Sequence, residues 1–196
     1  MSAKPGKNTQ RKEAETCQIR RRFLQIGLGA TASLAMPTSA FANLLKQPER
    51  SIALLNLHTG EKVKATYWAE GQYQPEELGA IHRVLRDHRT GDIHEIDSDL
   101  IDMLNLLHQQ MHGKQPFHVI SGYRSPKTNA MLSKNSSGVA KKSLHMQGRA
   151  IDIRLPGREL NELRKTAQQM KIGGVGFYPS SDFIHVDTGR VRSWHG

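Results

Sequence analysis

The sequence predicts an α+β fold with a small antiparallel sheet, helices packed on one side of it and an N-terminal β-hairpin. Two observations lead to this class. Segments with helical periodicity lie early in the 196-residue chain, whereas short segments with the alternation of strands gather in its second half. The chain also shows no internal repeat and no low-complexity tract, so one domain with an N-terminal tail accounts for its length.

The hairpin is predicted from two apolar segments that flank a compact turn. Residues 51–57 and 61–68 have strand-like composition, and His58-Thr59-Gly60 lies between them. Glycine supplies the backbone freedom that a short turn needs. We expect the two segments to pair as antiparallel strands.

Two helices are predicted next, over residues 75–88 and 98–112. Pro75 suits the first turn of a helix, where its missing N–H would have no partner, and two acidic residues follow it. Asp97 or Ser98 is expected to cap the second helix. The remaining elements are predicted as a strand at 117–121, a helix at 126–133, a loop at 134–144, a strand at 150–155, a helix at 157–170 and strands at 174–178 and 183–188.

The N-terminus is typical of a twin-arginine-like export signal. Arg20-Arg21-Arg22-Phe23-Leu24 precedes a Gly/Ala-rich apolar stretch that is too short to span a bilayer. The stretch ends in Ala40-Phe41-Ala42, which fits a signal peptidase site. We therefore predict a signal peptide over residues 1–42, a linker over 43–50 and a single domain over 51–196. The alternative is an uncleaved amphipathic anchor.

Export predicts a periplasmic protein with no stable membrane insertion after cleavage, and it argues against nucleic acid as a partner. Seven of the 28 Lys and Arg residues and two of the 18 Asp and Glu residues lie in the first 42 positions, so the formal net charge falls from +10 to +5 without them. The single cysteine, Cys17, lies in the same segment. Any metal bound by the remaining chain must therefore sit on His, Asp or Glu side chains.

Two of the ten histidines stand out as candidate metal ligands, together with one aspartate. His145 precedes a glycine-containing turn into the strand that carries Asp152 between Ile151 and Ile153. Side chains alternate along a strand, so the carboxylate of Asp152 is expected to face away from the core. His185 alternates with apolar neighbours in the same way. His145, Asp152 and His185 would make a strand-borne zinc site with an open fourth position, whereas the alternative is an exposed turn histidine and ordinary polar strand residues.

Three further residues are candidates for catalysis. Arg124 ends a strand in the turn Ser121-Gly-Tyr-Arg-Ser125, where its guanidinium could stabilise an oxyanion; a surface ion pair is the alternative. Asp182 lies three residues before His185, and Asp187 lies two residues after it. Either carboxylate could accept a proton from the attacking water.

The order of these motifs resembles the zinc D-Ala-D-Ala metallopeptidase group, whose superfamily also holds lysostaphin-type enzymes and the hedgehog fold. The closest likeness is to murein endopeptidases of the YcbK or MepK type, and it covers residues 51–194. The motifs that carry it are LNLHTGE at 55–61, SGYRS at 121–125, Ser143-x-His145 with Asp152 seven positions on, GGVGFYP at 173–179, FIHVDTG at 183–189 and the late Trp194.

The resemblance implies a zinc-dependent hydrolase of peptide cross-links in peptidoglycan, with His145, Asp152 and His185 as zinc ligands and Arg124 as the substrate or transition-state arginine. Much of the wider group has Glu-x-x-His, whereas this chain has Asp182-Phe-Ile-His185. The base is therefore open between Asp182, which is favoured, Asp187 and a water held by surrounding groups. The likeness further suggests 3-3 links between two meso-diaminopimelate residues, with specificity dependent on loop 134–144.

Two alternative functions remain from the sequence. One is a D,D- or L,D-carboxypeptidase that trims uncross-linked stem peptides. The other is a non-catalytic, zinc-stabilised murein-binding module, which the missing glutamate motivates. In each case the partner is the peptidoglycan stem peptide. The sequence does not indicate the oligomeric state.

Overall fold

The computed structural model describes residues 46–135 and 139–196. The signal peptide predicted over residues 1–42 lies outside these residues, as do the first three positions of the predicted linker. Within the described residues, no helix combines the length and the apolar character needed to cross a membrane.

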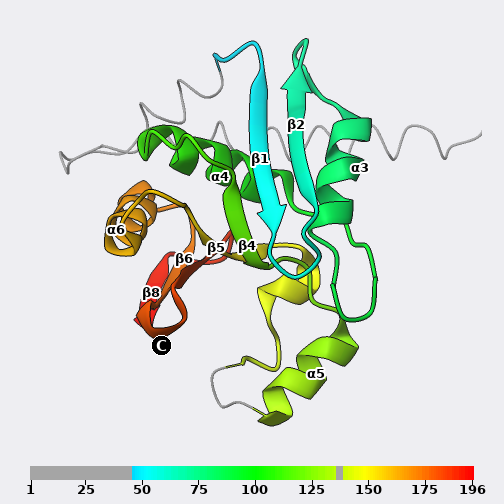
Figure 1. Ribbon diagram of the computed structural model, residues 1–196, viewed down its shortest axis with the longest axis vertical. Helices are drawn as coiled ribbons and strands as arrows, with labels where there is room; N and C mark the ends of the chain where they lie inside the picture. Colours follow the sequence, from blue (N-terminus) through cyan, green and yellow to red (C-terminus); the bar gives the residue numbers. More distant parts are fainter. Residues whose placement is uncertain (1–45, 136–138) are drawn as a thin grey trace, which may run out of the picture. The chain divides into compact units, whose positions relative to one another are not determined.

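The described residues form eight strands and four α-helices, with two short 3₁₀ turns (Figure 1). The strands are β1 (Arg50–Asn56), β2 (Lys62–Ala69), β3 (Gln72–Tyr73), β4 (Phe117–Ser121), β5 (Ala150–Arg154), β6 (Gly174–Tyr178), β7 (Phe183–Asp187) and β8 (Arg192–His195). The helices are α3 (Pro75–Val84), α4 (Ser98–Gln110), α5 (Pro126–Asn135) and α6 (Leu160–Met170), and the 3₁₀ turns are η1 (Leu144–Gln147) and η2 (Pro179–Ser181).

All eight strands belong to one sheet, in the order β3-β2-β1-β4-β5-β7-β6-β8. The pairs β1–β4 and β6–β8 are parallel, and the other pairs are antiparallel. Because α3 and α4 lie between β1 and β4 in the chain, they provide the long crossover that a parallel pair requires. The predicted α+β class and the hairpin are confirmed, and the sheet proves to be mixed.

Three helices cover one face of the sheet and share a single apolar core with it. Helix α3 packs on β2, α4 packs on β1, and α6 packs on β6 and β7 while also contacting α4. Fully buried side chains from both sides meet there, among them Leu54, Leu104, Phe117, Ile151 and Ile184. The prediction of helices on one side is confirmed for these three. Helix α5 contributes no residue to this core and lies apart from them in Figure 1.

Two strands were missed, and the largest differences in helix ends are those of α3 and α6. Strand β3 has only two residues, and β8 has the sequence Arg-Ser-Trp-His, so neither carries an apolar alternation that a sequence pattern could reveal. The first helix ends at Val84 instead of residue 88, and α6 begins at Leu160 instead of residue 157. Asp97 caps α4 as predicted, because its side chain accepts a hydrogen bond from the backbone N–H of Asp99.

Candidate metal centre

One row of residues crosses the face of the sheet opposite the helices. The strand registers place Ser121 beside Asp152, Asp152 beside His185, His185 beside Gly176, and Gly176 beside Trp194. Side chains directly opposite one another on neighbouring strands point to the same face. The alternation predicted for β5 is confirmed, since the residues on either side of Asp152 are fully buried in the core.

His145 reaches this row from η1, so the prediction that it lies on a strand was wrong. The side chain of Ser143 accepts a hydrogen bond from the backbone N–H of His145 at 3.3 Å and begins the turn. Gly148 ends it with φ of 66°, and a Cβ there would lie 2.1 Å from the carbonyl oxygen of Glu95. The turn therefore depends on a glycine and on a contact with a distant segment, which a sequence pattern does not reveal.

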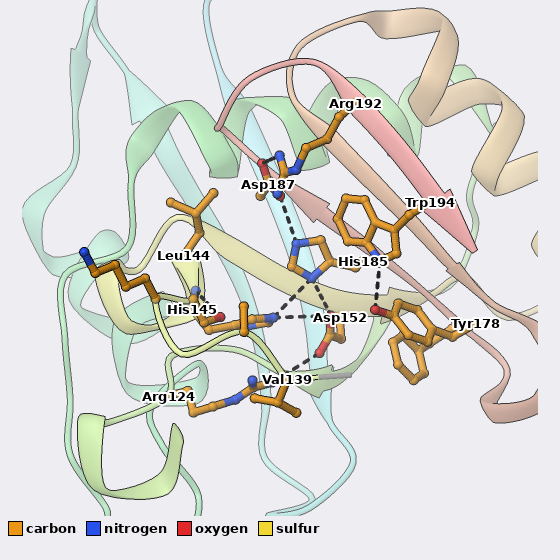
Figure 2. A pocket seen from close by; sticks show the side chains of 14 residues that line it. Arg124, Val139, Leu144, His145, Asp152, Tyr178, His185, Asp187, Arg192 and Trp194 are labelled. Carbon is orange, nitrogen blue, oxygen red and sulfur yellow. Dashed lines mark hydrogen bonds and ion pairs between the residues drawn. The ribbon is translucent and has the colours of Figure 1, made fainter. Parts of the chain in front are cut away.

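Three donor atoms meet at the centre of the site (Figure 2). His145 Nε2 lies 3.2 Å from His185 Nδ1 and 3.3 Å from Asp152 Oδ1, and His185 Nδ1 lies 2.9 Å from the same oxygen. Tetrahedral ligands at the usual zinc bond lengths of about 2.0–2.1 Å are roughly 3.3 Å apart. Within the described residues, this is the one group of three or more His, Cys, Asp or Glu side chains arranged to hold a metal.

The remaining ring nitrogens fix the orientation of both imidazoles. His145 Nδ1 lies 2.8 Å from the carbonyl oxygen of Gly122, which can only accept, so this nitrogen carries the proton. His185 Nε2 lies 3.0 Å from Asp187 Oδ2 and donates to that carboxylate. In the neutral form that a metal ligand requires, each ring would therefore turn a lone pair toward the other ring and toward Asp152, in place of the proton that a protonated ring donates there. This arrangement, in which an outer group holds each ligating histidine, is the one found around protein-bound metals and fits zinc.

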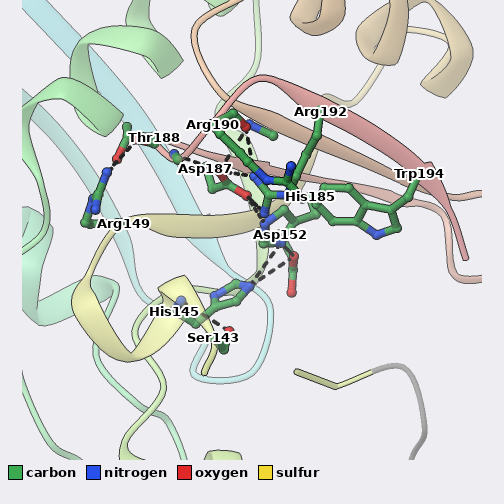
Figure 3. Close-up of polar contacts among 12 residues, drawn as sticks. Ser143, His145, Arg149, Asp152, His185, Asp187, Thr188, Arg190, Arg192 and Trp194 are labelled. Carbon is green, nitrogen blue, oxygen red and sulfur yellow. Dashed lines mark hydrogen bonds and ion pairs between the residues drawn. The ribbon is translucent and has the colours of Figure 1, made fainter. Parts of the chain in front are cut away.

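Asp187 is fully buried and holds His185 through a hydrogen bond to its Nε2 (Figure 3). Its carboxylate accepts bonds from Arg192 Nη2 at 2.7 Å and from the backbone N–H groups of Gly189 at 2.8 Å and Gly174 at 3.1 Å. Burial opposes ionisation, but the bonds from His185 and Arg192 outweigh it and hold the pKa of Asp187 well below its usual range. The structure thus places Asp187 where it orients His185, on the side of the imidazole that faces away from the donor cluster.

The electrostatics of the cluster favour a positive charge at its centre. Burial would lower the pKa of His185, but its hydrogen bonds to Asp152 and Asp187 outweigh burial and raise that pKa to about 9. Burial likewise opposes ionisation of Asp152, yet the charge of His145 and the bonds from both imidazoles keep the pKa of this carboxyl far below its usual range. The same field that holds a proton on His185 would stabilise a bound cation.

Arg124 lies beside the second oxygen of Asp152, as the sequence predicts for a site residue. Its Nη2 is 3.6 Å from Asp152 Oδ2 and 3.3 Å from Ser121 Oγ. Burial lowers the pKa of Arg124. The turn that carries it is held by Asp87, which sequence reasoning missed: this buried carboxylate accepts from the backbone N–H of Ser125 at 2.9 Å.

The structure does not bring Asp182 to the cluster. Its carboxylate forms an ion pair with Arg154, its side chain is 60% exposed, and it is absent from the residues that line the cavity at the site. Its φ of 53° is left-handed, a conformation that short polar residues such as aspartate tolerate in turns. A turn role accounts for the residue, and the position counts against Asp182 as the base.

A cavity of about 430 Å³ opens over the cluster, a volume suited to a ligand of small-molecule size. Tyr178 and Trp194 line it together with Lys142, which belongs to the lining segment 139–145. Asn129 of α5 fixes that segment, because its side-chain amide donates to the carbonyl oxygen of Ala140 at 3.1 Å. Sequence reasoning assigned no role to Tyr178 or Asn129.

Comparison with known proteins gives a consistent result. The model of the family described as peptidoglycan L,D-endopeptidase MepK matches residues 45–194. The chain is 43% identical over 175 residues to the peptidoglycan L,D-endopeptidase MepK of Escherichia coli K12, which covers 89% of this chain and 96% of that protein. It is 36% identical over 180 residues to the probable peptidoglycan L,D-endopeptidase MepK of Haemophilus influenzae, with 91% and 97% covered. The resemblance seen in the motifs is confirmed, and the chain belongs to the MepK family of M15 peptidases.

Proposed function

We propose that the protein is a zinc-dependent murein endopeptidase that hydrolyses peptide cross-links between stem peptides. The observation that carries the proposal is the meeting of His145 Nε2, Asp152 Oδ1 and His185 Nδ1 in one cavity, with mutual distances between 2.9 and 3.3 Å. Family membership supports the same reaction, because the relatives are named peptidoglycan L,D-endopeptidases.

The proposed target is the 3-3 link between two meso-diaminopimelate residues. Such a link joins a carbonyl on an L-configured centre to an amine on a D-configured centre, which agrees with the L,D bond in the relatives' name. The exposed Lys142 beside the cavity supports an acidic peptide, since each diaminopimelate in a 3-3 link keeps the free carboxylate of its D-configured centre.

Each residue of the site has a part in the proposed mechanism. His145, Asp152 and His185 would hold the zinc ion through the three clustered atoms. When bound, zinc supplies Lewis-acid activation of a water nucleophile and polarisation of the scissile carbonyl. Asp187 keeps His185 oriented for this task, and Arg124 stabilises the negative charge that develops on the carbonyl oxygen.

Defined muropeptides test the proposal directly. The purified protein with zinc is expected to convert 3-3 cross-linked dimers into monomers, as measured by mass spectrometry, and to leave 4-3 linked dimers intact. Removal of one terminal residue from uncross-linked stems would instead identify a carboxypeptidase. Binding of murein without any product would identify a non-catalytic module. Cleavage of 4-3 dimers alone would contradict the proposed bond.

Paired variants separate the two aspartates near His185. Asp187→Asn is expected to weaken zinc affinity about 10- to 100-fold, because the bond that orients His185 is weakened. Asp182→Asn is expected to change kcat by less than about threefold, since an exposed ion pair contributes little. Zinc titration and steady-state kinetics measure the two effects.

Asp182→Asn also decides the remaining question about the base. If this variant loses activity by about 100-fold or more in kcat at unchanged zinc content, Asp182 must leave Arg154 and accept the proton of the attacking water. Arg154→Gln is the matched control, because it frees the Asp182 carboxylate without removing it.

We also propose that residues 1–42 direct the protein to the periplasm by the twin-arginine route. The support is the arginine cluster at 20–22, the apolar stretch after it and the Ala40-Phe41-Ala42 site. Replacing Arg20 and Arg21 by lysine is expected to block export while retaining the charge. Cell fractionation measures this, and unchanged periplasmic accumulation would contradict the route.

A further inference from the structure

The side of the cavity formed by β6 and β8 carries a hydrogen-bond donor, the hydroxyl of Tyr178, that has no part in the proposed mechanism. Trp194 of β8 pairs with Gly176 of β6, and the centroid of its ring is 5.2 Å from that of His185. A Cβ at Gly176 would lie 2.6 Å from the indole carbon Cε2 of Trp194. Only glycine at this position lets the indole reach the ligand histidine.

This placement aims the indole N–H at a tyrosine. Trp194 Nε1 lies 2.9 Å from the hydroxyl oxygen of Tyr178. Indole nitrogen is a donor only, so the tyrosine oxygen must accept, and its own proton is left for another partner. Among residues 46–135 and 139–196, no group accepts a hydrogen bond from that hydroxyl.

The tyrosine ring is held in position by its neighbours. It stacks on Phe183 with 4.6 Å between ring centroids and an interplanar angle of 17°. On another side a Cβ at Gly196 would lie 2.2 Å from the ring, so the C-terminal residue closes against it. A donor fixed in this way needs no reorganisation when a ligand arrives.

Tyr178 and Arg124 approach the cluster from different sides. Both line the cavity with His145, Asp152 and His185. In Figure 2, Arg124 lies on one side of Asp152 and Tyr178 on the other, next to Trp194. A carbonyl oxygen that becomes negatively charged over the cluster can therefore receive a guanidinium from one side and a phenol O–H from the other.

We propose that Tyr178, oriented by Trp194 across Gly176, is a second hydrogen-bond donor to the oxyanion formed during peptide hydrolysis. The inference rests on the proposed endopeptidase function. It adds a catalytic residue, Tyr178, and a positioning residue, Trp194, to the site. A donor that acts on the oxyanion strengthens its bond as charge develops, so its removal lowers kcat more than it raises KM.

Kinetics with 3-3 dimers test the proposal. Tyr178→Phe is expected to lower kcat by a factor on the order of 100, with KM unchanged within about twofold. Trp194→Phe, which keeps an aromatic ring and removes the N–H, is expected to lower kcat by a smaller factor in the same direction. Tyr73→Phe is the matched control, because it removes a tyrosine hydroxyl at the opposite edge of the sheet, and it is expected to keep kcat.

A second readout separates this role from a loss of folding or metal. Trp68→Phe leaves Trp194 as the single tryptophan, and its emission reports on zinc bound at the neighbouring His185. In the Trp68→Phe background, the zinc affinity from this fluorescence titration is expected to be the same with and without the Tyr178→Phe substitution. A weaker affinity in Tyr178→Phe would overturn the proposal by showing a role in the metal site.

The remaining outcomes separate a failure of the role of Tyr178 from a failure of the endopeptidase function. Wild-type cleavage with an equal kcat for Tyr178→Phe overturns the role of Tyr178 and leaves the endopeptidase function standing. A rise in KM at constant kcat also overturns it, because the hydroxyl would then bind the ground state. A wild-type protein that binds zinc and splits no dimer overturns both proposals.

Discussion

Replacing His185 by alanine is expected to abolish cross-link cleavage and to prevent the protein from retaining stoichiometric zinc. The imidazole supplies one of three donor atoms, and its position depends on a hydrogen bond of 3.0 Å to Asp187 and on the register between β5 and β7. With two protein ligands left, the site would lose both affinity for the ion and the activated water. Metal analysis and digestion of 3-3 dimers measure the two losses.

His195→Ala is the matched control for this variant. His195 also lies in the part of the sheet formed by β5, β7, β6 and β8. Its ring packs on Phe177, 5.3 Å away, and the residue is absent from the cavity lining. The control is expected to keep zinc and activity. Cleavage at the wild-type rate by His185→Ala, or loss of zinc in His195→Ala alone, would contradict the assignment of the ligands.

The strand-borne half of the site follows directly from sequence patterns. Asp152 sits between two isoleucines and His185 between an isoleucine and a valine, so their common face is a consequence of the period of two along a strand. The pairing of the strands then brings the two side chains together, with Asp152 opposite His185. Local pattern alone predicted the face on which each of the two side chains lies, because both residues belong to regular strands.

Two features were not predicted, namely the 3₁₀ turn that carries His145 and the support of the arginine turn by Asp87, and both depend on contacts between distant segments. His145 lies on a 3₁₀ turn whose shape requires Gly148 to fit against Glu95, 53 positions earlier in the chain. Asp87 supports the arginine turn from the loop after α3, and no motif connects it with Ser125. A sequence pattern describes neighbours along the chain, so tertiary contacts of this kind stay hidden from it.

Asp182 illustrates the opposite case, in which a motif suggests a catalytic role that the position of the side chain does not support. Its spacing from His185 matches a catalytic carboxylate in the related group, but its partner, Arg154, lies 28 residues away in sequence, on β5, which pairs with the strand that follows Asp182. The left-handed backbone at Asp182 offers a second reason for an aspartate at this position. Both reasons are visible only in three dimensions.

Replacing Asp102 by asparagine is expected to lower the free energy of unfolding by about 3 to 5 kcal/mol without changing the chemistry of the site. The carboxylate of Asp102 on α4 accepts bonds from Arg50 Nη1 at 2.9 Å and from the hydroxyls of Tyr67 at 2.8 Å and Tyr73 at 3.0 Å. Within the described residues it is the one carboxylate that pairs with Arg50, which is only 2% exposed. Without the charge, the guanidinium would stay buried and uncompensated.

The reciprocal variant, at Arg50, is expected to lower the free energy of unfolding less than the variant at Asp102. Arg50→Met removes the cation but leaves Asp102 with two tyrosine hydroxyls that still donate to it, so a smaller loss of about 1 to 3 kcal/mol is expected. Burial, followed by the charge of Asp102, raises the pKa of Tyr73 to about 12, so this phenol stays protonated and remains a donor at neutral pH.

Denaturant unfolding and kinetics on the same samples separate stability from function. For a domain of this size, Asp102→Asn is expected to lower the melting temperature by roughly 10 °C. Below the transition its kcat is expected to equal that of the wild type, because the network joins α4 to β1, β2 and β3, whereas the candidate metal ligands lie on η1, β5 and β7. If Arg50→Met lowered the free energy of unfolding as much as Asp102→Asn does, the expectation that loss of the carboxylate costs more than loss of the guanidinium would be contradicted. A fall in kcat that exceeds the loss of folded protein would show that the two halves of the sheet are coupled.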